Sequence, residues 1–370
     1  MPKIVLTHVT KQWGKFIGVN DLNLEIEDGS FVTLLGSSGC GKTTTLRMIA
    51  GLETPTRGEI RFDDKIVFSS DKNINVPPAK REVGFLFQNY ALWPHMTVTQ
   101  NIAFGLETLK WKKSDISARV QEMLKTMRIE QFADRYPAEL SGGQQQRVAI
   151  ARTLAPKPRV LFMDEPLSNL DAKLRGEMRT ELKRLHRDTG STFVYVTHDQ
   201  LEAMTLSSKI CMMNEGMLQQ YAPPLTVYNR PANLFVADFV GNPSMNIIPA
   251  EAKKTGPAQA EISFLGIQAS FDGEKDFELG SGDVAIGIRP EFLPISEDGD
   301  IEGLAYSTLP AGMETTVKIK LGDTILSSVV FGAIDYETDA KIRFSVAGSG
   351  ILLFDRQSGK NIACGRLSVR

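Results

Sequence analysis

The eight residues that begin at Gly36 combine glycines with a lysine and a threonine at a spacing that suits phosphate binding. They match the pattern G-x-x-x-x-G-K-[ST] and consist of Gly36, Ser37, Ser38, Gly39, Cys40, Gly41, Lys42 and Thr43. The glycines allow successive backbone N–H groups to face phosphate oxygens, and the helix that follows adds partial positive charge. Lys42 can neutralise the β and γ phosphates, and the Thr43 hydroxyl can ligate Mg²⁺. The loop, together with Thr44, therefore predicts a site for MgATP.

A second group of chemically active residues ends the segment 159–165. The apolar run before Asp164 is typical of a buried strand, which would deliver this carboxylate to the metal side of the phosphates. Glu165, one residue further on, is placed to act as the general base that polarises the attacking water. An acidic pair that merely caps a strand in solvent is the alternative, and the upstream phosphate loop argues against it. The pair predicts ATP hydrolysis.

The elements that must position these groups alternate between strands and helices. Short apolar runs predict buried strands at 31–35, 83–87, 160–163 and 192–196, and a helix is expected at 43–50. Ser114 is expected to cap a further helix, in which one apolar face is formed by Ile116, Val120, Met123, Leu124 and Met127. We interpret that face as core packing within a helical insert. The pattern predicts an α/β domain with a P-loop nucleotide-binding site.

The pattern changes near Gly241. Val317, Ile319 and Leu321 alternate with lysines, and a similar alternation occurs around Phe344. Period-two alternation in short segments predicts a small antiparallel barrel or sandwich. We therefore expect an ATPase domain at 1–240, with a helical subdomain at about 89–155, and a β-rich domain at 241–370.

Composition limits the possible partners and compartment. The 42 Lys+Arg residues nearly balance 44 Asp+Glu, which argues against nucleic acid as a partner. Cys40, Cys211 and Cys364 lack the spacing of a disulfide framework or metal site, and no secretory signal is evident. No apolar run approaches the roughly 18 residues that span a bilayer. We expect a cytosolic protein that reaches a membrane only through another chain.

The stretch Leu140-Ser141-Gly142-Gly143-Gln144, taken with the two motifs above, makes the chain resemble the ATP-binding-cassette (ABC) ATPases. The remaining motifs follow in that family's order. Gln88 resembles the glutamine that senses the metal and couples to the membrane partner, 168–171 resembles the D-loop, and His198 resembles the switch histidine. Trp13 stands where the family places a ring that stacks on adenine.

The resemblance implies that one chain holds half of each active site. Ser141, Gly142, Gly143 and Gln144 would contact the ATP of the opposite subunit, because the start of a helix attracts anions. Two copies, or this chain and a closely related second ATPase subunit, would close head to tail around ATP. Hydrolysis would then open the dimer.

Longer segments resemble importers of the maltose/maltodextrin type, which take up carbohydrates and glycerol-phosphate-like solutes. These segments are 88–98, 197–206, 238–243, 287–291 and 312–315. The resemblance implies two transmembrane permease subunits, an extracellular solute-binding protein, a location on the cytoplasmic face of the membrane, and a C-terminal regulatory domain of OB-like barrels. Ser37, Trp93 and Gln145 depart from the usual residues without removing a required group, and 251–279 matches poorly.

Two alternatives stay open. An ATPase for polyamine, sulfate or iron import would share nearly all of these motifs. A soluble ABC protein that acts on DNA or ribosomes is less favoured, because such proteins usually carry a long coiled-coil insertion or two cassettes, and here there is one phosphate loop.

Overall fold

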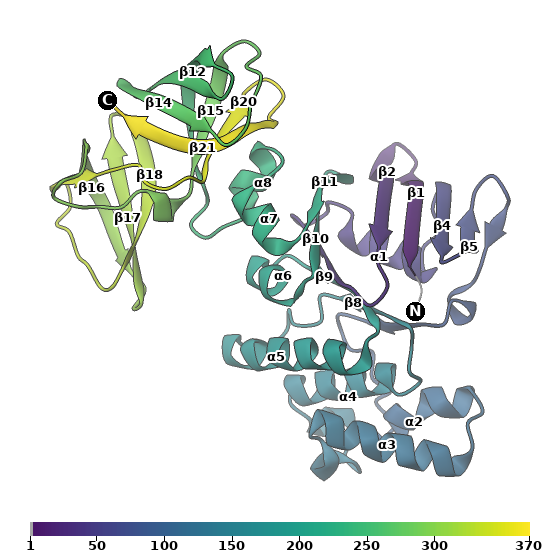
Figure 1. The fold of residues 1–370 in the computed structure, drawn as a ribbon. Coiled ribbons are helices and arrows are strands. Elements are labelled where there is room, and N and C mark those ends of the chain that lie inside the picture. The colour runs from purple at the N-terminus through teal and green to yellow at the C-terminus, as the bar shows by residue number, and fades with distance from the viewer. Residues whose placement is uncertain (1–2) are drawn as a thin grey trace. The chain divides into compact units, whose positions relative to one another are not determined.

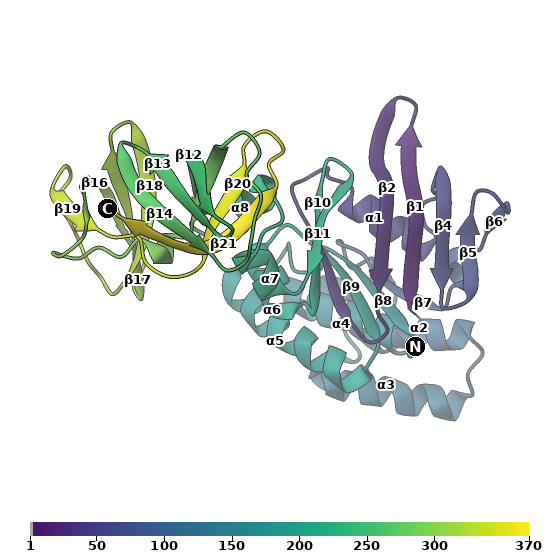
Figure 2. The same cartoon turned by 45° about the horizontal axis from the view of Figure 1, so that its top comes forward.

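The chain divides between Pro224 and Leu225 into two compact units (Figures 1 and 2). The structure, a computed structural model, describes residues 3–370. The second unit begins before the expected boundary at 240/241. Two short helices that precede Gly241 are grouped with the C-terminal strands and not with the first unit. These helices are α7 (Pro224–Asn229), at the junction, and α8 (Leu234–Phe239).

The strands of the first unit form one antiparallel and one mainly parallel sheet. The antiparallel sheet has the order β2-β1-β4-β5-β6. Its strands are β1 (Ile4–Trp13), β2 (Phe16–Ile26), β4 (Arg57–Phe62), β5 (Lys65–Ser69) and β6 (Ile74–Asn75). The other sheet has the order β11-β10-β3-β9-β8-β7, with only β11 antiparallel to its neighbour. Its strands are β3 (Phe31–Leu35), β7 (Val83–Leu86), β8 (Val160–Asp164), β9 (Thr192–Thr197), β10 (Lys209–Asn214) and β11 (Met217–Ala222).

Helices cover the mainly parallel sheet and extend beyond it. They are α1 (Lys42–Ala50), α2 (Val98–Thr108), α3 (Lys113–Met127), α4 (Gly142–Leu154), α5 (Ala172–Thr189) and α6 (Gln200–Leu206), with 3₁₀ turns η1 (Pro78–Lys80), η2 (Glu130–Phe132) and η3 (Pro137–Glu139). In Figure 1, α2, α3 and α4 lie together at one end of the unit, with α5 alongside. The segment expected to be a helical subdomain therefore contains α2, α3 and α4.

The predicted strands are confirmed, and their burial explains the apolar sequence. Every residue of β3, β8 and β9 is buried, as expected for parallel strands covered on both faces. Successive side chains of β8 enter two different cores. Leu161 and Met163 pack with the helices α4 and α5, whereas Val160 and Phe162 pack with α1 and the antiparallel sheet. The central sheet thus separates two apolar cores.

Helix α3 keeps the predicted apolar face but begins earlier than expected. Its buried residues include Val120, Met123, Leu124 and Met127, and Ile116 packs against them while partly buried. The helix starts at Lys113, so the prediction that Ser114 is the N-cap is wrong. The Ser114 hydroxyl donates to the Asp115 carboxylate, 3.1 Å away, instead of accepting from the backbone.

Helices α4 and α5 approach each other closely near their first turns. A Cβ atom built on Gly143 would lie 2.3 Å from Leu174 Cδ2, whereas one built on Gly142 would meet nothing closer than Leu170 Cδ2 at 4.0 Å. A side chain at 143 would therefore force Leu174 to shift, whereas position 142 has room.

The second unit is almost entirely antiparallel, as predicted. A closed barrel is formed by β12 (Asn246–Gly256), β13 (Gln259–Phe264), β14 (Ile267–Gly273), β21 (Asn361–Val369), β20 (Ile351–Asp355) and β15 (Asp283–Ile288). A four-stranded sheet has the order β18 (Thr324–Phe331), β17 (Glu314–Leu321), β16 (Ile301–Pro310) and β19 (Lys341–Phe344). The 3₁₀ turn η4 (Pro290–Phe292) lies between β15 and β16 in sequence. Val317 and Ile319 are buried while Lys320 is exposed, which confirms the alternation.

A buried arginine joins α7 and α8 to the barrel within this unit. The Arg289 guanidinium donates to the carbonyls of Tyr228, at 2.6 Å, and of Val240, and it stacks over the Tyr228 ring at 3.9 Å. Burial lowers the pKa of Arg289. Arg289 lies in 287–291, one of the segments that resemble the importers, and it ties α7 and α8 to the barrel by satisfying their carbonyl groups.

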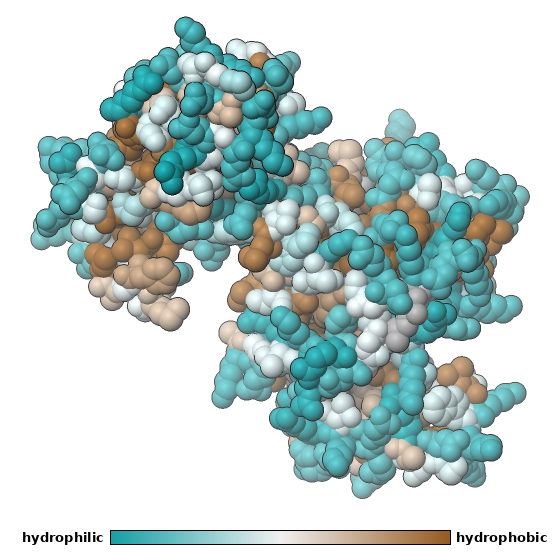
Figure 3. Space-filling model, in the orientation of Figure 1, coloured by the Kyte–Doolittle hydropathy of each residue, from teal (hydrophilic) through white to brown (hydrophobic). Residues whose placement is uncertain are grey.

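The surface of the second unit carries apolar side chains beside the β16–β18 strands (Figure 3). Leu309, Met313 and Phe331 are exposed there, and Glu314 pairs with Phe331 across the β17–β18 hairpin. Among residues 3–370, no helix is both long and apolar enough to cross a bilayer.

The contact between α4 and α5 yields a stability prediction. We expect Gly143→Ala to lower the unfolding free energy of the first unit by about 1–3 kcal/mol, because the new methyl group overlaps Leu174. All three tryptophans, Trp13, Trp93 and Trp111, lie in this unit, so thermal unfolding followed by tryptophan fluorescence reports on it selectively.

The matched control is Gly142→Ala, which has open space and should be neutral or slightly stabilising. Combining Gly143→Ala with Leu174→Ala should cost less than the sum of the two single changes, since the overlap is then removed. Equal effects of alanine at 142 and 143 would contradict the packing described here.

Candidate functional site

The phosphate loop connects β3 to α1 and turns on glycines with left-handed backbone angles. Gly39 and Gly41 have φ values of 79° and 101°. A Cβ on Gly41 would lie 2.5 Å from the Gly18 carbonyl oxygen, and one on Gly36 would lie 2.2 Å from that of Met213. Side chains at these two positions would therefore push the loop away from β2 and β10. Ser37, Ser38 and Gly39 are exposed at the tip of the loop, and Cys40 is buried beneath it.

The Lys42 ammonium lies inside this loop. Its Nζ donates to the carbonyl oxygens of Gly36 at 2.8 Å and Ser37 at 2.7 Å, and the side chain is buried. The N-cap of α1 is Gly41, so no side chain caps the first turn of the helix. The first N–H groups of the helix, next to the Lys42 charge, are thus suited to an anion such as phosphate.

Thr43 and Asp164 meet at the ends of two separate elements. The Thr43 hydroxyl donates to Asp164 Oδ1 at 2.8 Å, and Arg47 Nη2 lies 3.3 Å from Asp164 Oδ2. The Asp164 side chain is only 5% exposed. Two of the three residues expected at Mg²⁺, Thr43 and Asp164, are therefore adjacent, and the third, Gln88, contacts Ser168 instead. Arg47 was not predicted, although its position one helical turn after Thr43 places it on the same face.

Glu165 and His198 follow neighbouring parallel strands and face each other. His198 Nδ1 lies 3.4 Å from Glu165 Oε1. Glu165 has a φ of 45°, a left-handed conformation that non-glycine residues seldom adopt. Its N–H donates to the Val196 carbonyl at 3.1 Å, which fixes its backbone to β9. Such backbone strain is common where a side chain must point in one direction for function.

A buried carboxylate stabilises the turn that carries His198. Glu202 accepts hydrogen bonds from Tyr195 at 2.8 Å and from Thr197 at 2.7 Å. Asp199 caps α6 by accepting from two backbone N–H groups, and Arg175 Nη1 lies 3.4 Å from it. Burial raises the pKa of Glu202, and also raises that of the Tyr195 hydroxyl. This network was not predicted from the sequence.

Gln88 contacts the segment that was compared with the D-loop. Its Nε2 lies 3.5 Å from the Ser168 hydroxyl, and Asn169 Nδ2 donates to the Gln88 carbonyl at 3.3 Å. Ser168 in turn donates to the Glu165 carbonyl at 2.9 Å. Asp171 ends the segment and caps α5 through the Leu174 N–H. Gln88, Glu165 and the D-loop therefore form one connected group.

The segment Ser141–Gln144 lies at the start of α4 and is capped within the chain. The Ser141 hydroxyl accepts from the Gln144 N–H at 3.4 Å, and the Gln144 side chain accepts from the Ser141 N–H at 2.9 Å. The N–H groups of Gly142 and Gly143 remain at the open end of the helix. Within residues 3–370, no hydrogen bond or ion pair joins this segment to the phosphate loop.

Trp13 ends β1 and packs close to the phosphate loop. A Cβ on Gly18 would lie 2.5 Å from the Trp13 ring, and the carbonyl of the same Gly18 lies against Gly41. The Trp13 side chain is 44% exposed, and the ring of Phe16, at 6.2 Å, stacks beside it. Phe16 was not predicted as part of this surface.

A family model matches part of the first unit, and individual relatives match nearly the whole chain. The family model "ABC transporter" matches residues 19–168. The trehalose/maltose import ATP-binding protein MalK of Thermococcus litoralis is 42% identical over 98% of this chain and 100% of its own length. The sn-glycerol-3-phosphate import ATP-binding protein UgpC of a Ruegeria species is 41% identical over the same shares. Maltose/maltodextrin import ATP-binding protein MalK of Escherichia coli is 43% identical over 87% of this chain and 86% of its own.

Solved structures match the first unit. A dimeric, post-hydrolysis structure of the ATP-binding cassette MJ0796 with ADP and Pi has a TM-score of 0.52 and 34% identity, and covers 60% of this chain and 98% of its own. The cbiO1 structure from Clostridium perfringens has a TM-score of 0.55 and 30% identity, over 60% of this chain and 89% of its own. The full-length sequence similarity, together with the site geometry, shows that this chain belongs to the family of ABC transporter ATP-binding proteins, which bind and hydrolyse ATP.

Proposed function

We propose that the chain hydrolyses MgATP at the edge of its parallel sheet to drive import of a carbohydrate or glycerol-phosphate-like solute. The observation that carries this proposal is the convergence of Thr43, Asp164, Glu165 and His198 from α1, β8 and β9. Relatives named as import ATP-binding proteins for trehalose and maltose or for glycerol phosphate support this class of solute.

The residues present fit MgATP. Lys42 and the first N–H groups of α1 would bind the phosphates, while the oxygens of Thr43 and Asp164 are the hard donors that Mg²⁺ prefers. The ion would supply charge that stabilises the phosphoryl group in the transition state. Glu165 would accept a proton from water, and His198, whose Nδ1 lies 3.4 Å from Glu165, would orient that carboxylate and contact the γ-phosphate.

We infer that a second ATPase subunit completes each site. Ser141–Gln144 has no bond to the phosphate loop of its own chain among the described residues, yet it presents a helix start suited to an anion. The ATP bound by one copy would join the signature segment of the other. Dimeric cassette structures such as MJ0796 support this arrangement.

The permease subunits would dock on an exposed aromatic surface formed by Trp93 and Phe104, whose rings lie 5.3 Å apart. Their side chains are 41% and 37% exposed. The loop that carries Trp93 is tied to α2, because the buried Asn101 amide donates to the carbonyls of Trp93 and Met96. Asn101 was not predicted as a support for this loop.

The loop also connects the docking surface with the signature helix. Arg152, near the end of α4, donates to the carbonyls of Tyr90 and Ala91 at 2.8 and 2.6 Å. Gln88 begins the loop beside Ser168. Movement of a permease against Trp93 would therefore displace both Gln88, with its D-loop contacts, and α4. The subunit would act at the cytoplasmic face of the membrane, with a solute-binding protein outside and an OB-like regulatory domain at 241–370.

Replacement of Glu165 tests the assignment of the general base. We expect Glu165→Gln to bind ATP with near-normal affinity and to lose hydrolysis by about 100-fold or more, because the amide cannot accept the proton. Nucleotide binding by calorimetry and phosphate release measure the two steps separately. Glu177→Gln, an exposed change on α5, is the matched control. Phosphate release from Glu165→Gln within a few-fold of the native rate would remove Glu165 from this role.

Charging the docking surface tests the permease interface. We expect Trp93→Glu combined with Phe104→Glu to leave ATP binding and hydrolysis by the isolated chain unchanged and to abolish co-purification with its membrane subunits. The desolvation of two carboxylates opposes docking. Leu52→Glu, a similar change at a residue 44% exposed elsewhere, should leave co-purification intact. Normal co-purification of the double variant would exclude this surface.

A further inference from the structure

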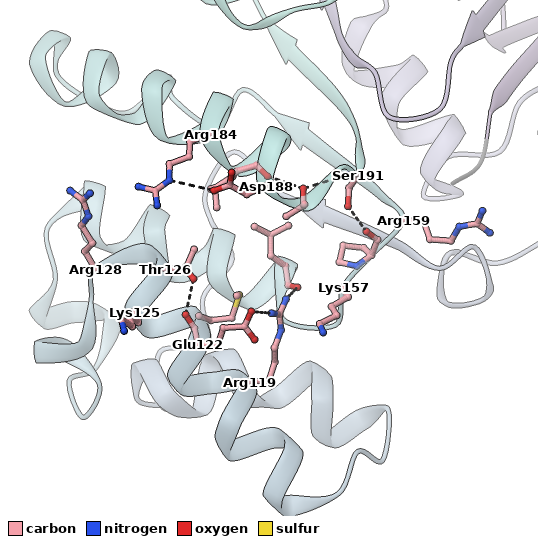
Figure 4. A pocket seen from close by; sticks show the side chains of 15 residues that line it. Arg119, Glu122, Lys125, Thr126, Arg128, Lys157, Arg159, Arg184, Asp188 and Ser191 are labelled. Carbon is pink, nitrogen blue, oxygen red and sulfur yellow. Dashed lines mark hydrogen bonds and ion pairs between the residues drawn. The ribbon is translucent and has the colours of Figure 1, made fainter.

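The first unit contains a cavity of about 710 Å³ on the side of the helical segment that is shared by α3, α4 and α5 (Figure 4). Its floor is apolar and includes Met123, Leu154 and Leu185. Its rim comes from α3, from the end of α5, and from residues 157–159 between α4 and β8. The volume lies in the range of pockets that hold small molecules, about 300–1,000 Å³.

The rim of this cavity is strongly basic although the chain as a whole is nearly neutral. Six cationic residues line it, against the two acidic residues Glu122 and Asp188. The cationic residues are Arg119, Lys125, Arg128, Lys157, Arg159 and Arg184. Both acids are already engaged. Glu122 pairs with Arg119 at 2.7 Å, and Asp188 is shared between Arg184 and Arg187 at 3.3 and 3.2 Å.

One cation has a structural task that explains its presence. Arg119 is buried and donates to the carbonyls of Leu154 and Ala155 at 2.9 and 3.0 Å. It therefore satisfies the end of α4, where helix carbonyls lack partners. Arg159 also has a partner, Asp63, at 3.6 Å.

Three other cations have no such task. In the part of the chain that the structure describes, the side chains of Lys125, Arg128 and Lys157 make no hydrogen bond or ion pair. Lys125 and Arg128 come from the end of α3 and Lys157 from the segment between α4 and β8, and Arg184 comes from α5 (Figure 4). Arg128 is the C-cap of α3 and holds a left-handed backbone, with φ of 54°, so its place beside the rim is fixed by the end of the helix.

We propose that this cavity is a second anion site, separate from the ATP site, and that it binds a small soluble molecule carrying two or more phosphate groups. Arginine and lysine are the side chains that bind phosphate most readily, and several around one hollow favour a multivalent ligand. The apolar floor formed by Met123 and Leu185 would contact the organic part of such a molecule. A concave pocket of this size suits a free metabolite rather than a flat membrane.

The location gives the site regulatory potential. The cavity lies at the C-terminal ends of α4 and α5, whose N-terminal ends carry the signature segment at Ser141 and the D-loop at Asp171. It also touches Arg159 and Ser191, which directly precede β8 and β9. A ligand that bridges Arg128 and Lys157 would tie the helical segment to the core through elements that end at the active site.

Calorimetric titration with inorganic tripolyphosphate tests the proposal directly. The full chain carrying Lys42→Ala removes the phosphate-loop charge, so the remaining binding reports on a second site. At about 0.15 M salt, where exposed charges are screened, we expect saturable binding of one anion per chain. Adding Lys125→Gln, Arg128→Gln and Lys157→Gln should weaken it at least ten-fold. This readout involves no hydrolysis and does not rest on the proposed function.

The matched control removes three exposed lysines elsewhere, as Lys80→Gln, Lys320→Gln and Lys360→Gln in the same background. It keeps the net charge equal to that of the cavity variant and should bind tripolyphosphate like the parent. Equal weakening by both triple changes would reduce the effect to general charge and overturn the site. Absence of saturable binding below about 1 mM, or sedimentation with anionic phosphatidylglycerol vesicles in place of tripolyphosphate binding, would also overturn it.

Discussion

The hydrogen bond from Thr43 to Asp164 joins the two motifs on which the ATPase site depends. Thr43 ends the phosphate loop in the first turn of α1, while Asp164 ends β8 more than a hundred residues later. Because β3, β9 and β8 are adjacent parallel strands, their carboxyl ends place the phosphate loop, His198 and Glu165 along one edge. The two cores on either side of the sheet hold this edge in place. Packing far from the site therefore determines the short distances between its side chains.

Under the proposed function, one chain supplies only part of each ATP site. Lys42, Thr43 and Asp164 are the proposed phosphate and metal ligands, and the open helix start at Gly142 lies outside their hydrogen-bonding network. Closing two copies around ATP would bring a helix start to each nucleotide. The capping box between Ser141 and Gln144 keeps that helix start folded in the meantime. ATP would thereby favour the closed dimer, and loss of the γ-phosphate would favour the open one.

Much of the parallel sheet and the proximity of Thr43 to Asp164 could be predicted, because buried strands and glycine turns leave strong local signals. The supporting residues could not. Arg47 and Arg152 bond to partners that only folding brings near. Asn101 bonds to carbonyls at most eight residues away, but a single polar residue in a helix carries no periodic signal. The start of α3 was predicted at Ser114, since serine is a common N-cap, but its hydroxyl bonds to Asp115 instead. The role of Arg289 in the C-terminal unit could not be predicted either. It binds carbonyls at the ends of α7 and α8, and sequence spacing does not reveal these partners.

The claim that each nucleotide is shared between two copies is tested most directly by hydrogen exchange in a mixed dimer. An isotope-labelled copy with Lys42→Ala, which should not hold ATP itself, is mixed with an unlabelled Glu165→Gln copy that binds ATP without hydrolysing it. We expect MgATP to slow amide exchange at residues 141–146 of the labelled copy only when the unlabelled copy is present. Unchanged exchange there, while the phosphate loop of the unlabelled copy becomes protected, would contradict a shared site.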